Sequence, residues 1–225
     1  RVVSEQVLFA MPETGIGLFP DVGGTYFLPR LPGELGTYLG LTGARLKSAD
    51  VLGTGIATHC VKRADHAALE AALVAAPLPD KAAVDVVIAG FAHDPGPAPI
   101  LAQLPLIDRL FAGASVAEIM QALEADAPWG QEQAKLIRTK SPTSVKLTFA
   151  QLRRGRKLNF RDCMILEWRM CNHVAAGHDF YEGVRAVIID KDHAPRWQPA
   201  TLEAVDDAYI EGYFAPLPDG DLRFA

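Results

Sequence analysis

The sequence predicts an α/β fold in its first part and a helical region in the rest. Two observations indicate this division. Short apolar runs at 7–11 and 57–61 alternate with helical patterns, whereas apolar residues recur at helical spacing through most of the chain after the Pro- and Gly-rich segment 94–99. We therefore expect one region at 1–95 and a helical region at 96–225.

The first region is predicted to alternate strands and helices. Pro12 ends a strand at 7–11, and Ser48 is the expected N-cap of a short helix at 48–52. Gly43 is suited to cap the C-terminus of the helix before it. The remaining elements expected here are a helix within 32–46 that ends at Gly43, a strand at 57–61 and a helix at 65–76.

The second region is predicted to be almost wholly helical. Ser115 and Asp126 stand at cap positions, and Ser141 followed by Pro142 is typical of a helix start. The expected helices are 104–112, 116–125, 129–140, 142–154 and 159–176.

Composition points to a globular protein without a nucleic-acid surface. The chain has 225 residues, 49% of them hydrophobic, and a net charge of −5. No run is long enough to cross a membrane, and the start at Arg1 resembles an internal position rather than a signal peptide. Three cysteines without paired spacing predict no zinc site and favour a reducing, cytoplasmic location.

The basic run 153–157 has no interleaved aromatic residues. We interpret it as a solvated loop, with a contact to cofactor phosphates or an acidic neighbour as the alternative.

The stretch 9–31 is the most informative part of the sequence. It reads Phe-Ala-Met-Pro-Glu-Thr-Gly-Ile-Gly-Leu-Phe-Pro-Asp-Val-Gly-Gly-Thr-Tyr-Phe-Leu-Pro-Arg-Leu and places Glu13 and Asp21 on either side of a glycine-rich turn. Apolar neighbours are expected to desolvate Glu13, which raises the pKa of its carboxyl toward the range useful for acid–base catalysis. The glycine pair 23–24 predicts a helix start whose first amides face outward as donors.

Plainer roles remain open for both acids. Asp21 can serve only as a helix N-cap, and Glu13 can be a solvated loop acid.

This stretch resembles the enoyl-CoA hydratase/isomerase (crotonase) superfamily, and within it the 3-hydroxyisobutyryl-CoA hydrolase branch, because Pro20-Asp21-Val22 stands where hydratases usually have Pro-Gly-Ala. The resemblance continues through 41–46, 55–61, 141–144 and 178–186 and covers nearly the whole chain. It implies a crotonase-like ββα spiral, incomplete because the N-terminal part is absent, followed by helices that form a CoA wall and an oligomer interface.

The resemblance also implies a reaction and a set of residues. The reaction is hydrolysis of 3-hydroxyisobutyryl-CoA to 3-hydroxyisobutyrate and CoA in valine catabolism, with Glu13 as acid/base or nucleophile and Asp21 positioning water or substrate. The backbone amides that hold the oxyanion lie before the Pro-Glu motif in the family, so we expect a separate or unlisted N-terminal segment to supply them. The substrate-binding residues implied are Glu13, Asp21, Gly17, Phe19, Phe180 and Lys191.

Two other functions stay open. An enoyl-CoA hydratase or isomerase would use Glu13 as its acid/base and Asp21 as a cap. A noncatalytic crotonase-like subunit would serve oligomerisation alone. The expected partners are an acyl-CoA substrate and a second copy of the chain, with no nucleic acid, membrane, metal or cofactor beyond the CoA of the substrate.

Overall fold

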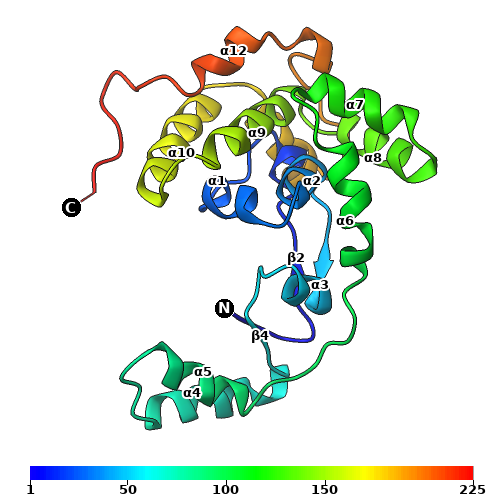
Figure 1. The fold of residues 1–225 in the computed structure, drawn as a ribbon. Helices are drawn as coiled ribbons and strands as arrows, with labels where there is room; N and C mark the ends of the chain where they lie inside the picture. The colour runs from blue at the N-terminus through cyan, green and yellow to red at the C-terminus, as the bar shows by residue number, and fades with distance from the viewer. Residues whose placement is uncertain (225) are drawn as a thin grey trace. The chain divides into compact units, whose positions relative to one another are not determined.

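The structure, a computed structural model, describes residues 1–224 and contains two compact units. Unit 1 comprises 1–10 and 45–104, and unit 2 comprises 11–44 and the chain from 105 onward (Figure 1). This division differs from the one expected at residue 95, because 11–44 packs with the C-terminal helices rather than with its sequence neighbours. Both units are made from the strands and helices described below.

Unit 1 holds two short sheets and a helical hairpin. Strand β1 (Val2–Val3) pairs in parallel with β4 (His59–Cys60), and β2 (Leu8–Phe9) pairs antiparallel with β3 (Leu46–Lys47). The predicted strands at 7–11 and 57–61 therefore exist, but each is only two residues long because its partner pairs over no more. The helices of this unit are α3 (Ser48–Gly53), η3 (Arg63–Asp65), α4 (His66–Ala75) and α5 (Lys81–Ala89).

Two local predictions in unit 1 need correction. The N-cap of α3 is Lys47 without a side-chain hydrogen bond, so Ser48 does not cap it. The sequence reading also missed α5, whose N-cap Asp80 accepts a hydrogen bond from Ala83 N. The signal was there, since Asp80 precedes an apolar run at helical spacing.

Unit 2 is helical. Helix α6 (Pro99–Leu110) begins in unit 1 and ends in unit 2. The other elements are η1 (Glu13–Ile16), α1 (Gly24–Phe27), η2 (Leu28–Arg30), α2 (Leu35–Thr42), α7 (Val116–Ala125), α8 (Pro128–Arg138), α9 (Pro142–Gly155), α10 (Phe160–Ala175), α11 (Asp179–Val184), the π-helix η4 (Arg185–Ile189), η5 (Leu202–Ala204) and α12 (Asp207–Gly212).

Most predicted helix ends in unit 2 are confirmed. Ser115, Ser141 and Asn159 accept backbone hydrogen bonds as N-caps of α7, α9 and α10, and Gly43 ends α2 with φ +69°. Asp126 is one exception, because Ala127 is the N-cap of α8 while the Asp126 carboxylate pairs with Arg109. The helix expected at 104–112 is another, because α6 begins earlier, at Pro99, and ends at Leu110.

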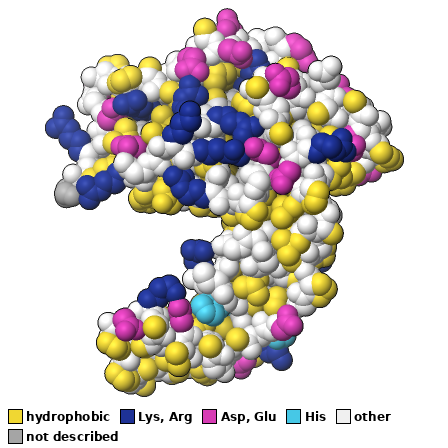
Figure 2. All heavy atoms as spheres, viewed as in Figure 1, with side chains coloured by type: hydrophobic (Ala, Val, Ile, Leu, Met, Phe, Trp, Pro, Cys, Tyr) yellow, Lys and Arg dark blue, Asp and Glu magenta, His cyan; other side chains and the backbone are white. Residues whose placement is uncertain are grey.

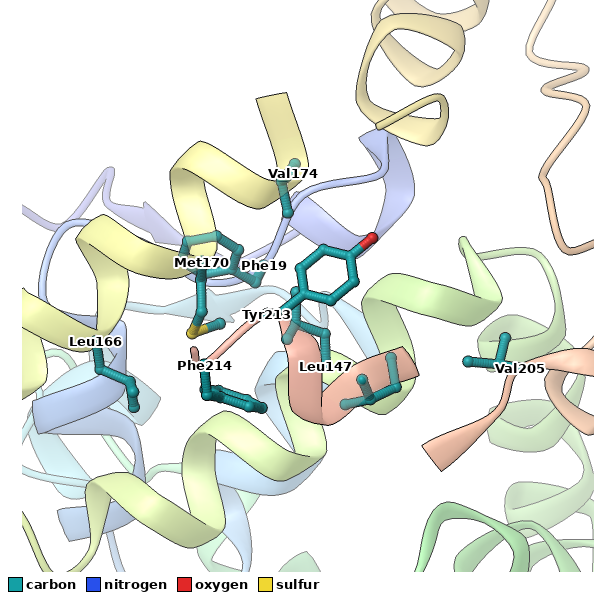
Figure 3. Close-up of a cluster of buried hydrophobic side chains, with 9 residues drawn as sticks. Phe19, Leu147, Leu166, Met170, Val174, Val205, Tyr213 and Phe214 are labelled. Atoms are coloured by element: carbon teal, nitrogen blue, oxygen red, sulfur yellow. The ribbon is translucent and has the colours of Figure 1, made fainter. Parts of the chain in front are cut away.

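The core of unit 2 forms where α9, α10 and α12 meet the segment after η1. Figure 3 shows its side chains converging, with Tyr213 and Phe214 from the end of α12 lying against residues of α9 and α10. Phe19 is fully buried there. The buried members of this cluster are Phe19, Leu147, Leu166, Met170, Val174, Val205, Ile210, Tyr213 and Phe214.

Three arginines of the basic run at 153–157 form ion pairs with acidic side chains of the same chain. Figure 2 shows Lys and Arg side chains gathered over α9 and α10. Arg153 and Arg156 pair with Glu34, and Arg154 pairs with Glu211. The interpretation as a merely solvated loop is therefore wrong for these three arginines, which hold acidic neighbours.

Within residues 1–224, no helix combines the length and apolarity that a membrane span requires. The same residues contain no cluster of His, Cys, Asp and Glu suited to a metal ion.

Candidate active site

Glu13 opens the short helix η1, directly after Pro12. Its side chain is partly buried, and among the described residues no group donates a hydrogen bond to its buried Oε2. Burial is the largest influence and raises the pKa of this carboxyl to about 7, with a further upward contribution from the charge of Asp21. Glu13 can therefore exchange a proton near neutral pH, as the sequence predicted from its apolar neighbours.

Asp21 lies in the turn before α1. Burial raises the pKa of its carboxyl, and its charge acts on Glu13, which places the two acids in one electrostatic site. The N-cap of α1 is Gly23 with φ +94°, and no side-chain hydrogen bond caps this helix. The structure thus gives the Asp21 side chain no capping role at α1.

The backbone amides at the start of α1 already donate hydrogen bonds within the protein. Gly24 N donates to Asp21 O at 2.8 Å, whereas Gly23 N and Thr25 N donate to the carboxylate of Glu167. The prediction that these amides face outward is wrong, because a buried carboxylate from α10 already accepts from them. They cannot act as an oxyanion hole in this arrangement.

Glu167 is a site residue that the sequence reading missed. It is 8% exposed, and its Oε2 and Oε1 accept from Gly23 N and Thr25 N at 3.0 and 2.9 Å. A signal was available, because Glu167 falls on the same face of α10 as the buried residues Cys163 and Met170. A carboxylate on a core-facing helix position usually has a specific partner.

The turn that carries Glu13 is held from two sides. Ser141 N donates to Thr14 O at 3.0 Å, and the Ser141 hydroxyl donates to Asp179 Oδ2 at 2.6 Å. The other oxygen of Asp179 accepts from Gln198 N at 2.8 Å. The starts of α9 and α11 are thereby joined beneath the Glu13 turn.

Close backbone packing explains two glycines around this turn. A Cβ at Gly17, which has φ +73°, would lie 2.2 Å from Asp179 O. A Cβ at Gly183 would lie 2.4 Å from the carbonyl atoms of Ile16. Gly17 is thus placed at the site for packing against α11, and the cavity beside it, about 20 Å³, has room for about one water molecule.

The three remaining predicted substrate-binding residues, Phe19, Phe180 and Lys191, differ in their burial and contacts. Phe19 is fully buried in the core, so the structure gives it a packing environment rather than an accessible face. Phe180 is partly buried, packs against that core and meets Tyr181 edge-on. Lys191 is exposed with φ +56°, and its neighbours Asp190 and Asp192 both pair with Arg185. Arg185 also pairs with Glu182, so one guanidinium is shared by three carboxylates and the surroundings of the exposed Lys191 ammonium stay acidic.

Comparison with known proteins defines the family. The family model described as enoyl-CoA hydratase/isomerase matches residues 1–214. The 3-hydroxyisobutyryl-CoA hydrolase, mitochondrial, of Xenopus laevis is 46% identical over 99% of this chain, and that of Homo sapiens is 44% identical over 100% of it. The chain spans 60% of the length of these relatives.

Solved structures agree with this fold. A carnitinyl-CoA dehydratase from Mycobacterium thermoresistibile is 40% identical, with a TM-score of 0.87 over 98% of this chain and 62% of its own. An enoyl-CoA hydratase from Rhodobacter sphaeroides 2.4.1 is also 40% identical, with a TM-score of 0.86 over 100% of this chain and 64% of its own.

The relatives also correct one expectation. The sequence predicted a cytoplasmic location from its unpaired cysteines, but the relatives from Xenopus laevis, Mus musculus and Homo sapiens are named mitochondrial. Unpaired cysteines indicate a reducing environment only and do not separate these compartments. From its matched residues, its relatives and its fold, the chain belongs to the enoyl-CoA hydratase/isomerase family.

Proposed function

We propose that this chain carries the catalytic carboxyl groups of an acyl-CoA thioester hydrolase. Its substrate is 3-hydroxyisobutyryl-CoA, and its products are 3-hydroxyisobutyrate and CoA. The observation that carries the proposal is the pair Glu13 and Asp21, two partly buried carboxyls in one electrostatic site, neither used as a cap. The name of the relatives at 44–46% identity agrees with it.

The proposed chemistry begins at Glu13. Hydrolysis of a thioester needs a nucleophile or a base that activates water at the carbonyl carbon. A carboxyl whose pKa lies at about 7 is ionised in a useful fraction at neutral pH and still accepts a proton readily. In its ionised form Glu13 either deprotonates the water that attacks the carbonyl carbon, or attacks that carbon itself to form a mixed anhydride that water then hydrolyses. In both routes the C–S bond breaks, the CoA thiolate leaves, and the proton lost by water passes to that thiolate.

Asp21 is proposed to orient water or the substrate hydroxyl. Burial raises the pKa of Glu13, and the negative charge of the Asp21 carboxylate adds a smaller upward contribution. The side chain of Asp21 is not committed to the start of α1, so its oxygens remain available for a ligand. Donors for the oxyanion are proposed to come from outside the described turn at 21–25, since the amides of Gly23 and Thr25 are taken by Glu167.

Phe180 and Lys191 are proposed as CoA contacts, Lys191 through the phosphates and Phe180 through its ring. Gly17 is proposed to contact the substrate through its backbone, because the space left by its missing side chain is filled by Asp179 O. The proposal includes a role in valine catabolism and assembly with a second copy of the chain.

Hydration of an enoyl-CoA is the second candidate, because one solved relative at 40% identity is named an enoyl-CoA hydratase. The two functions differ in their need for Asp21. A hydratase that uses Glu13 alone would tolerate the loss of the Asp21 charge, whereas the proposed hydrolase would not.

The test uses the natural polypeptide that carries this sequence and measures free-thiol release from 3-hydroxyisobutyryl-CoA beside hydration of crotonyl-CoA. Asp21→Asn should lower thiol release by about a hundredfold or more, and Asp219→Asn, at an exposed position, should leave it unchanged. Hydration without thiol release in the wild type would establish the hydratase. Silence on both substrates with no binding of CoA would favour a noncatalytic subunit.

A further inference from the structure

Glu167 stands beneath the turn that carries Asp21. It comes from α10, far away in the sequence, and is 8% exposed. Its two oxygens accept from the amides of Gly23 and Thr25 at 3.0 and 2.9 Å, on either side of Gly24. One carboxylate thus bridges two amides of the start of α1.

This turn has an unfavourable backbone that needs support. Val22 has φ +45° and an exposed side chain, and Gly23 follows with φ +94°. A β-branched residue rarely adopts a positive φ, so surrounding contacts must stabilise the conformation. The two hydrogen bonds to Glu167 act on the residues immediately after Val22.

Both oxygens of Glu167 accept from backbone amides. Acceptance by both oxygens fits the ionised carboxylate, although burial and the charge of Asp21 raise the pKa of this group. The ionisable groups that face it among the described residues are Asp21 from the turn and Cys163 and Cys171 from its own helix. Helix α9 contributes the neutral Gln151, which donates to Thr25 Oγ1 and Pro20 O.

We propose that Glu167 is the positioning residue of Asp21: by holding the amides of Gly23 and Thr25 it fixes the turn that aims the Asp21 carboxylate toward Glu13. This inference rests on the proposed function of the Glu13–Asp21 pair. Glu167 itself touches no reacting atom, because its oxygens are occupied by backbone amides and its side chain is buried.

The first experiment compares Glu167→Gln with Glu118→Gln. The glutamine at 167 keeps the size but presents an NH₂ donor to one backbone amide, so one hydrogen bond is lost. Glu118, on α7, is the matched control, because its Oε2 also accepts a backbone hydrogen bond. The donor is Ala114 N, at 2.9 Å. We expect Glu167→Gln to lower kcat for thiol release about tenfold or more with KM little changed, and Glu118→Gln to leave both unchanged.

The second experiment does not depend on activity. Carboxyl-carbon NMR titration follows the ionisation of Asp21, and hydrogen exchange follows the amides of Gly23 and Thr25. Glu167→Gln removes a negative charge near Asp21 and loosens its turn, so the pKa of Asp21 should fall and both amides should exchange faster. Glu118→Gln keeps an oxygen that can accept from Ala114 N, so exchange at Ala114 and the titration of Asp21 should both match the wild type.

Glu167→Asp covers the case in which Glu167→Gln fails to fold. It keeps the charge but shortens the reach, so we expect faster exchange at Gly23 and Thr25 and a lower kcat, with the Asp21 titration near that of the wild type. An unchanged Asp21 titration in Glu167→Gln, or unchanged amide exchange in both variants, would overturn the proposal. A wild type without thiol release would instead remove the proposed function, and the NMR result would still decide on Glu167.

Discussion

The hydroxyl of Ser141 donates to Oδ2 of Asp179 at 2.6 Å, and both residues are buried. The same serine caps α9 through Ser144 N and holds Thr14 O with its own amide. A single small residue therefore links the starts of two helices to the turn of Glu13. These contacts fix the backbone of the glycine-rich turn and with it the position of the Glu13 carboxyl.

Replacing Ser141 with Ala tests this link. The variant loses the cap of α9 and leaves a buried oxygen of Asp179 without one donor, so we expect a loss of about 2–3 kcal/mol in the free energy of unfolding. Ser115→Ala is the control, because Ser115 caps α7 through Glu118 N without a buried carboxylate behind it, and about 1 kcal/mol is expected there. Equal losses in urea unfolding of the two variants would contradict the role assigned to the Ser141–Asp179 contact.

Gly17→Ala tests the close packing of η1 on α11. The new methyl group would lie 2.2 Å from Asp179 O at a residue with φ +73°. Gly55 has φ +75° with nothing within 4 Å of its Cβ position, so Gly55→Ala isolates the cost of the positive φ. We expect about 1 kcal/mol for Gly55→Ala and at least about 3 kcal/mol for Gly17→Ala, both from denaturant unfolding.

Glu13→Gln should change the pH dependence of stability. The pKa of Glu13 is about 7 in the folded chain against 4.5 for the ordinary carboxyl. The folded state therefore holds the proton more tightly, and stability falls as pH rises from about 4.5 to 7. We expect the variant to match the wild type near pH 4 and to exceed it by roughly 1–2 kcal/mol at pH 8, after allowance for solvent screening.

That comparison is made by urea unfolding at both pH values. Because the neighbouring acids Asp21 and Glu167 remain in both proteins, the difference between them reports Glu13. A variant that is no more stable than the wild type at pH 8 would mean that Glu13 titrates near its ordinary value.

Lys191→Ala tests the proposed contact with CoA phosphates. Lys191 is exposed, and the acids beside it are paired with Arg185. We expect the Kd for CoA to rise by up to about tenfold at low salt and by less at high salt, with kcat unchanged. Lys135→Ala, an exposed lysine on α8, is the control. If Lys191→Ala bound CoA with the same Kd as the wild type at both salt concentrations, a phosphate contact at Lys191 would be excluded.

Local sequence rules predicted much of the helical part. Ser115 and Ser141 are caps because each hydroxyl accepts from the backbone amide three residues further along the chain, which the order of residues alone specifies. The helix expected from 159 likewise starts there, with Asn159 as its cap. Gly43 ends its helix for the same local reason. The desolvation of Glu13 also followed from its apolar neighbours.

Long-range contacts could not be predicted in this way. The amides of Gly23 and Thr25 were expected to be free, and their acceptor Glu167 is more than a hundred residues away in the chain. Asp126 stands where a cap is expected but pairs with Arg109 from another helix. Phe19 follows the Glu13 turn in sequence, yet the core formed by α9, α10 and α12 buries its ring. In each case the role of the residue depends on a contact with a residue that is distant in the sequence and close in the folded chain.

The most direct test of the account is the pH dependence of thiol release from 3-hydroxyisobutyryl-CoA by the natural polypeptide and its Glu13→Gln variant. With Glu13 acting as a carboxylate of pKa about 7, kcat/KM should rise with pH through about 7 and level off above it. The variant should lose about a hundredfold or more of the activity and the pH dependence with it. A variant that releases thiol as fast as the wild type, with the same pH profile, would contradict the assignment of Glu13 as the reacting group.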